Sequence, residues 1–93
     1  MKPRIGKKVY CVYKNSILVK EVGFLGNESF IVDDYGGSTY EDSWEWYYED
    51  YGKEWFTSIA KAKKELRSRA KEEYGVSLKI IKPYDDCYVL EDD

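Results

Sequence analysis

Adjacent carboxylates in turn-like segments are the side chains of this chain whose type and spacing could do chemistry. The pairs are Asp33 with Asp34, Glu41 with Asp42, Glu49 with Asp50, and Asp85 with Asp86. Two carboxyl groups that face each other can act as general acid and general base in a hydrolysis. However, neighbouring residues on a strand point to opposite faces, and aspartates in turns normally accept hydrogen bonds from backbone amides. The pairs therefore favour a structural role, and we expect the protein not to be an enzyme.

Cysteine and histidine usage points the same way. The chain has no histidine, which removes the Ser-His, Cys-His and His-metal designs. Its two cysteines, Cys11 and Cys87, stand too far apart for a CxxC pair or a zinc-ligand spacing. We expect no metal and no cofactor, and two buried thiols in a reducing cytoplasm. A disulfide between the first and last strands stays open as the alternative.

The stretch YEDSWEWYYEDYGKEWF, residues 40–56, interleaves aromatic and acidic side chains. The strand period of two assigns Trp44, Trp46 and Tyr48 to one face, which we expect to be core together with Phe56. Carboxylates spaced along a strand can imitate a phosphate backbone, and Trp and Tyr dominate protein–protein hot spots. The predicted partner-binding surface is therefore the remainder: Tyr40, Glu41, Asp42, Glu45, Tyr47, Glu49, Asp50 and Tyr51.

Charge is segregated along the chain, although the net charge is only -3. Residues 1–20 carry six basic groups and no acidic group, whereas residues 28–54 carry nine acidic groups against Lys53 alone. Residues 57–74 return to a net +3, and residues 85–93 carry -5. Such blocks either complement each other within the fold or present faces of opposite sign.

Two alternative ligands follow from the same residues. Bases of single-stranded nucleic acid stack on aromatic rings, but the acidic segment would repel phosphates. A nucleic-acid-binding module would therefore use the basic residues Lys7, Lys8, Lys61, Lys64 and Lys71. Exposed tyrosines between the loops could instead line a peptide-binding groove, for which Tyr35, Tyr40, Tyr47 and Tyr51 are the candidates.

The elements that must position these residues follow from periodicity and turn signals. Alternation predicts strands over residues 8–13, 17–24, 28–33, 44–48 and 53–56. Apolar residues at intervals of three or four predict a helix over 57–74, namely Ile59, Ala62, Leu66, Ala70 and Tyr74. Thr57 or Ser58 is the expected N-cap and Gly75 the left-handed cap that ends the helix. Two further strands are expected at 77–82 and 87–91.

Chain length and composition predict one domain over residues 1–93. The expected class is α+β, mainly β: a small five-stranded SH3-like antiparallel barrel over 1–56, the amphipathic helix over 57–74, and a C-terminal hairpin over 76–91. No apolar run approaches the roughly 20 residues that span a bilayer. The first residues lack the apolar core of a signal peptide, so we expect no membrane partner and a cytoplasmic location.

Two segments carry a resemblance to a known group of proteins. IGKKVYCVY places a glycine and charged residues before a V-Y strand, and GKEWFTSIAKAKKEL contains Gly52, Trp55, Phe56 and Thr57 before an alanine-rich helix. Over roughly residues 5–67 the chain resembles small SH3-like proteins of phages and prophages of Gram-positive bacteria. The resemblance implies an SH3-like fold and a mobile-element origin, and it brings no catalytic residues. The C-terminal hairpin and the acidity of residues 41–50 go beyond that pattern.

Together these features predict a non-enzymatic macromolecule-binding protein. We expect it to be phage-encoded, to act in the host cytoplasm, and to bind a host protein that has a basic cleft. The sharpest version is an anti-CRISPR or other anti-defence inhibitor that mimics nucleic acid. The alternative is the nucleic-acid-binding module, and the sequence leaves open whether the protein is a monomer or a dimer.

Overall fold

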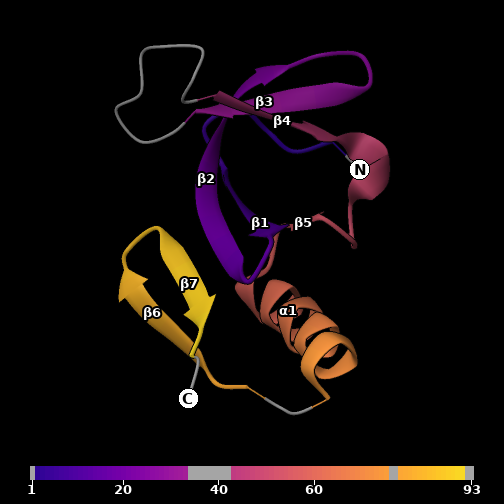
Figure 1. Ribbon diagram of the computed structural model, residues 1–93. Helices are drawn as coiled ribbons and strands as arrows, with labels where there is room; N and C mark the ends of the chain where they lie inside the picture. The colour runs from indigo at the N-terminus through magenta and orange to yellow at the C-terminus, as the bar shows by residue number, and fades with distance from the viewer. Residues whose placement is uncertain (1, 34–42, 76–77, 92–93) are drawn as a thin grey trace.

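A curled antiparallel sheet, one helix and a terminal hairpin make up the structure, a computed structural model that describes residues 2–33, 43–75 and 78–91 (Figure 1). The elements are β1 (Lys8–Tyr13), β2 (Ser16–Leu25), β3 (Ser29–Asp33), β4 (Ser43–Tyr47), the short 3₁₀ helix η2 (Tyr48–Asp50), β5 (Trp55–Phe56), α1 (Ile59–Tyr74), β6 (Ile80–Tyr84) and β7 (Cys87–Leu90). The expected mainly-β fold is confirmed. Among the described residues, no helix is long and apolar enough to cross a membrane.

Five strands form the SH3-like half-barrel in the order β4-β3-β2-β1-β5. The tight β1–β2 turn takes Lys14 to a φ of 54°, and the ladder then runs from the pair Tyr13–Ser16 to the pair Lys8–Glu21. Between β2 and β3 the register shifts at Gly23, between Val22 and Phe24. A bulge of this kind increases twist and bends the strand, which helps the sheet to curl.

β2 pairs with three other strands. It is long enough for two of them to pair with different parts of the same edge. β1 pairs with Ser16–Glu21 on one edge. On the other edge β7 pairs with Ser16–Leu18, and β3 pairs with residues from Glu21 to Leu25. The C-terminal hairpin is therefore joined to the sheet by backbone hydrogen bonds as well as by side-chain packing.

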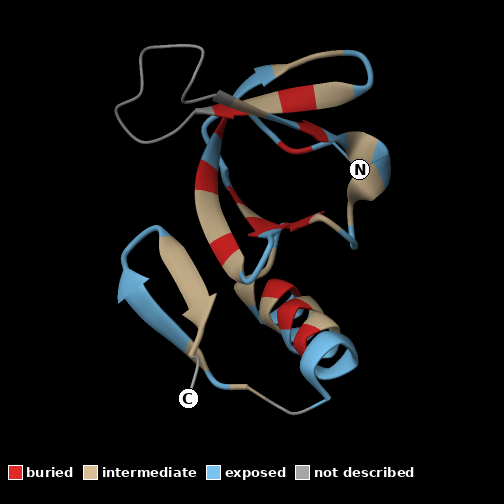
Figure 2. Cartoon of the chain, in the orientation of Figure 1, coloured by how far each residue is buried: buried red, intermediate tan, exposed pale blue. Residues whose placement is uncertain are grey.

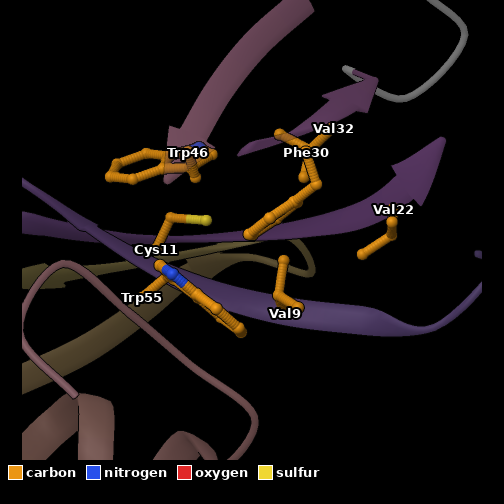
Figure 3. Packing of buried hydrophobic residues seen from close by; sticks show 7 residues of the cluster. All are labelled: Val9, Cys11, Val22, Phe30, Val32, Trp46 and Trp55. Atoms are coloured by element: carbon orange, nitrogen blue, oxygen red, sulfur yellow. The ribbon is translucent and has the colours of Figure 1, made fainter. Parts of the chain in front are cut away.

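The sheet buries a hydrophobic cluster on each of its two faces, which is why two adjacent residues of β1, Cys11 and Val12, are both buried. Figure 2 shows the buried positions in red. The concave cluster, shown in Figure 3, comprises Val9, Cys11, Val22, Phe30, Val32, Trp46 and Trp55. The convex cluster comprises Val12, Ile17, Phe56, Ala62 and Leu66, where α1 and the hairpin cover the sheet. Burying such side chains contributes about 1.5–3 kcal/mol each, before entropy is counted.

The aromatic stretch behaves largely as its alternation predicts. Trp46 is buried in the concave cluster, and Trp44 and Tyr48 pack against it half-buried. Tyr48 lies in η2, because the fourth strand ends one residue earlier than expected. Trp55 and Phe56 are both buried, because β5 lies between the clusters and presents one ring to each.

The helix begins after its N-cap Ser58, which makes no side-chain capping bond, and ends at Gly75 with a φ of 73°. Three of the expected stripe residues are buried, namely Ala62, Leu66 and Ala70, and Ile59 is half-buried. Tyr74 is a correction: its side chain is 46% exposed, and its hydroxyl accepts a hydrogen bond from the Asn15 side-chain amide in the β1–β2 turn at 2.9 Å.

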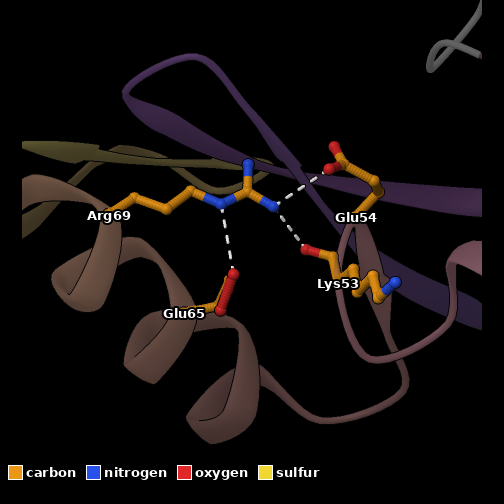
Figure 4. Close-up of polar contacts among 4 residues, drawn as sticks. All are labelled: Lys53, Glu54, Glu65 and Arg69. Carbon is orange, nitrogen blue, oxygen red and sulfur yellow. Dashed lines mark hydrogen bonds and ion pairs between the residues drawn. The ribbon is translucent and has the colours of Figure 1, made fainter. Parts of the chain in front are cut away.

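Arg69 joins the helix to the turn before β5 (Figure 4). Its guanidinium donates to the Glu65 carboxylate one helical turn away at 3.3 Å, to the Glu54 carboxylate at 3.1 Å, and to the Lys53 carbonyl. The Glu65–Arg69 pair lies within the helix, and the bonds to residues 53 and 54 extend it across elements. These bonds fix the orientation of α1 relative to β5.

The two cysteines are free thiols; Cys11 is buried as expected, whereas Cys87 is a correction, because it is only half-buried in the hairpin. Leu18 pairs with Cys11 across one edge of β2 and with Cys87 across the other, so one strand separates them. Neighbouring strands lie about 4.8 Å apart, which places the two Cα atoms about 10 Å from each other. Disulfides need a Cα separation of roughly 4.4–6.8 Å, so this fold does not allow the bond.

Candidate functional site

The convex side of β3 and β4 carries exposed aromatic and acidic side chains. Ile31 lies opposite both Phe24 of β2 and Glu45 of β4, and Tyr47 lies opposite Ser29. Because paired residues of a ladder point to the same side, these side chains all lie opposite the concave core. Phe24 is 59% exposed and Tyr47 is 44% exposed.

Carboxylates lie beside Tyr47. Glu45 precedes it by two residues on β4 and accepts a hydrogen bond from the Ser29 hydroxyl. Glu28 and Glu49 are exposed and line a hollow of about 360 Å³ together with Asn27, Tyr47 and Tyr48. We call Phe24, Glu28, Ile31, Glu45, Tyr47 and Glu49 the acidic aromatic face.

The hollow has well-fixed walls. The Tyr48 hydroxyl donates to the Gly26 carbonyl at 2.7 Å, and the Tyr48 amide donates to the Glu28 carbonyl at 3.0 Å. The indole Nε1 of Trp55 donates to the Tyr47 carbonyl at 2.7 Å. Tyr47 is therefore held by its backbone while its ring stays in solvent, and such preorganisation lowers the entropic cost of binding.

The structure divides the binding surface that the sequence predicted. Glu45, Tyr47 and Glu49 come together and are exposed. Asp50 is half-buried in a turn, where its carbonyl accepts from the amides of residues 53 and 54. Tyr51 needs correction, because its ring packs 4.8 Å from that of Trp55 against the concave core. Tyr40, Glu41 and Asp42 lie outside the described residues, as does Tyr35.

Phe24 and Ile31 lie on the same side of the sheet as Glu45 and Tyr47, and Glu28 lines the hollow beside Tyr47; sequence reasoning missed all three. Plain alternation along β2 would place Phe24 on the same side as Val22, which is buried in the concave core. The register shift at Gly23 instead turns Phe24 outward and Leu25 inward. A glycine inside a predicted strand is the signal that could have revealed this, since such glycines often mark bulges.

The basic residues of the alternative hypothesis fall into separate places. Lys7 and Lys8 line a groove at the start of β1, whereas Lys61 and Lys64 line a hollow beside Glu65 on α1. Lys71 is exposed in the last turn of the helix. Lys7 and Lys8 thus line one depression and Lys61 and Lys64 another, and the two depressions adjoin where the Thr57 hydroxyl of the first lies 3.4 Å from the Tyr51 hydroxyl of the second.

The described residues offer little to a reaction. Burial raises the pKa of the Cys11 thiol to about 12, although nearby Lys20 partly opposes the rise. Burial and the neighbouring Asp86 raise the pKa of Cys87 as well, so neither thiol is an activated nucleophile. No group of three or more Cys, Asp or Glu side chains suited to a metal occurs within residues 2–33, 43–75 and 78–91.

Comparisons of the chain with protein-family models, with curated proteins and with solved structures found no match.

Proposed function

We propose that the protein is a non-enzymatic binding protein whose acidic aromatic face docks onto a basic surface of another protein. The observation that carries the proposal is the unequal covering of the convex side. At β1, β2 and β5 the apolar side chains of this side are buried under α1 and the hairpin. Farther along the sheet the rings of Phe24 on β2 and Tyr47 on β4 stay exposed, and carboxylates lie beside Tyr47.

Such a face suits protein recognition. A desolvated aromatic ring at the centre of an interface is a typical hot spot, and charges at the rim steer the partner and select it. Phe24 and Tyr47 supply the apolar area, and Glu28, Glu45 and Glu49 supply the charge. The partner of matching chemistry exposes lysine or arginine side chains around an apolar pocket.

A basic cleft that normally holds nucleic acid has this chemistry. Carboxylates carried by a rigid sheet would occupy the places of phosphates, and Tyr47 would stack where a base stacks. In its sharpest form the proposal describes a phage-encoded anti-defence inhibitor, such as an anti-CRISPR protein, that acts without a cofactor in the host cytoplasm. The resemblance to small proteins of phages and prophages supports this form.

The test captures candidate partners and then measures their affinity for the protein and its variants. The immobilised protein is used to isolate partners from a lysate of a Gram-positive host, and the affinity of each purified partner is then measured directly. In a face variant that carries Glu28→Gln, Glu45→Gln and Glu49→Gln, we expect the affinity to fall at least tenfold. The affinity of the original protein should also weaken steeply between roughly 50 and 500 mM salt.

A matched control removes the same charge elsewhere. Glu72→Gln, Glu73→Gln and Asp85→Asn change exposed residues outside the acidic aromatic face and should leave the affinity unchanged. If both triple variants lost the same affinity, net charge alone would explain the loss, and the proposal would be contradicted. A partner that binds nucleic acid and this protein at the same time would contradict the mimicry.

A further inference from the structure

A second surface of opposite sign lies at the N-terminal segment. A groove of about 280 Å³ is lined by Lys2, Pro3, Arg4, Lys7, Lys8, Val9 and Thr57. Four of these seven residues are cations and none is acidic. We call this feature the N-terminal groove, and it shares no residue with the acidic aromatic face.

The groove belongs to the folded part of the protein, because its cationic segment is bonded to β2. The amide of Gly6 donates to the Val22 carbonyl at 2.9 Å, and the amide of Val22 donates to the Lys7 carbonyl at 2.9 Å. The amide of Lys7 also donates to the Arg4 carbonyl at 3.1 Å, across a turn that takes Gly6 to a φ of 85°. Pro3 is buried, which fixes the segment further.

The four cations have no carboxylate partner in the described part of the chain. The ion pairs there are made by Arg69 with Glu54 and Glu65, not by any cation of the groove. Glu21 lies opposite Lys8 in the β1–β2 ladder without an ion pair between them. Lys2 contacts the ring face of Tyr48, with its Nζ 5.5 Å from the ring centroid. The groove therefore concentrates like charges, and a bound anion would relieve their repulsion.

The donors in the groove match a phosphate. Arg4 can offer a planar guanidinium fork, the lysines offer ammonium groups, and Thr57 offers a hydroxyl whose oxygen lies 3.4 Å from the Tyr51 hydroxyl. The volume is near the lower end of the roughly 300–1,000 Å³ that is usual for small-molecule sites. It therefore suits a phosphoryl group with part of a sugar better than a large organic ligand.

We propose that the N-terminal groove is a binding site for phosphate esters, supplied either by a free nucleotide or by the backbone of a nucleic-acid strand. Arg4 and Lys7 hold the phosphate oxygens, with Lys2 and Lys8 beside them. The site uses no residue of the acidic aromatic face, so the failure of one proposal leaves the other standing, and Lys2 adjoins that face through its contact with Tyr48. Of the five lysines expected from the sequence it uses Lys7 and Lys8, because Lys61 and Lys64 line the neighbouring hollow instead.

The test measures two ligands on the full chain. Fluorescence polarisation with labelled oligothymidylate, at roughly 50 mM salt, reports strand binding, and calorimetry with uridine monophosphate reports binding of a free nucleotide. Saturable binding of either probe is expected, and the stronger probe identifies the source of the phosphate. If neither probe binds at millimolar concentration, the proposal is overturned.

A pair of matched double variants locates the site. Arg4→Gln with Lys7→Gln should weaken binding at least tenfold and reduce the salt slope for the strand by about one per cation removed. Lys61→Gln with Lys64→Gln removes the same charge from the helix hollow and should leave the affinity within about twofold. Equal loss in both variants would show that only net charge matters and would contradict the site. Lys2→Gln provides a further groove variant, which changes an exposed side chain outside the strands.

Discussion

The two ends of the convex side of the sheet differ in whether other elements cover their apolar side chains. At one end Val12, Ile17 and Phe56 are buried beneath α1 and the C-terminal hairpin. At the other end Phe24 and Tyr47 point away from the concave core in the same way, yet remain in solvent. Alternation along a strand decides the side to which a residue points, but it does not decide whether anything covers that side.

The covering is decided by how β2 shares its edge. β7 occupies the edge at Ser16–Leu18, and β3 takes it over from Glu21 onward. The hairpin therefore covers the first part of β2 only, and α1 contacts β1, β2 and β5. The covered end supports the fold, whereas the bare end leaves the rings of Phe24 and Tyr47 in solvent. The following variants test this division.

The largest expected effect is at the covered end. Leu66 is 1% exposed and lies between α1 and the sheet. Leu66→Ala leaves a cavity and should lower the free energy of unfolding by about 2–5 kcal/mol. Urea denaturation followed by circular dichroism measures this loss. A loss below about 1 kcal/mol would show that the helix is not an essential cover.

Two tryptophan variants test whether the indole of Trp55 holds the backbone of Tyr47, and the expected change in the free energy of unfolding is smaller. The Nε1 of Trp55 donates to the Tyr47 carbonyl, whereas the Nε1 of Trp46 is buried without a partner among the described residues. Trp55→Phe should therefore cost about 1–3 kcal/mol more than Trp46→Phe, because only the first leaves a carbonyl unpaired. Chemical denaturation of both variants gives the difference. Equal costs would mean that the indole bond does not hold Tyr47.

The cysteines report how firmly each region is packed. Cys11 is buried in the concave core, and Cys87 is half-buried in the hairpin, so a thiol reagent should modify Cys87 first. Burial raises the pKa of Cys11 from 9.0 to about 12, so the folded protein keeps a proton that the unfolded chain loses. The stability that Cys11 contributes is therefore complete below pH 9 and should decline as the pH rises toward 12. Comparison with Cys11→Ala across this range isolates the effect, and a pH-independent difference would contradict it.

The smallest effect on stability is expected at the bare end. Phe24→Ser should change the free energy of unfolding by less than about 0.5 kcal/mol, since the ring is mostly in solvent. The same change should weaken a protein partner found through the acidic aromatic face. A stability loss comparable to that of Leu66→Ala would show that the two ends are covered alike. Thermal denaturation beside the original protein provides the measurement.

Local patterns predicted the elements because each pattern is decided within a few residues. KVYCVY alternates and forms β1, and the helix stripe with Gly75 forms α1 almost over the expected span. Trp46 was assigned correctly to the core for the same reason. Glu45, Tyr47 and Glu49 were placed on the binding surface by the same alternation, and all three are exposed.

What escaped prediction depends on contacts between distant segments. The outward position of Phe24 follows from a register shift between β2 and β3, not from its own neighbours. Tyr51 was expected at the surface, but the position of β5 brings it against Trp55. Lys7 and Lys8 share a groove with residue 57, whereas Lys61 and Lys64 line another hollow. Local sequence patterns do not predict this grouping, because it depends on how α1 packs against β1.

The bond from the Trp55 indole to the Tyr47 carbonyl also bears on self-association. β4 is the outermost strand at one side of the sheet, and an outermost strand can template the addition of strands from other copies. At Tyr47 the carbonyl is already occupied by the indole, so an incoming strand cannot form a ladder bond there. Glu45 adds a negative charge to the same short strand. The bond thus helps to keep an aromatic-rich strand from nucleating aggregates while its tyrosine ring remains accessible.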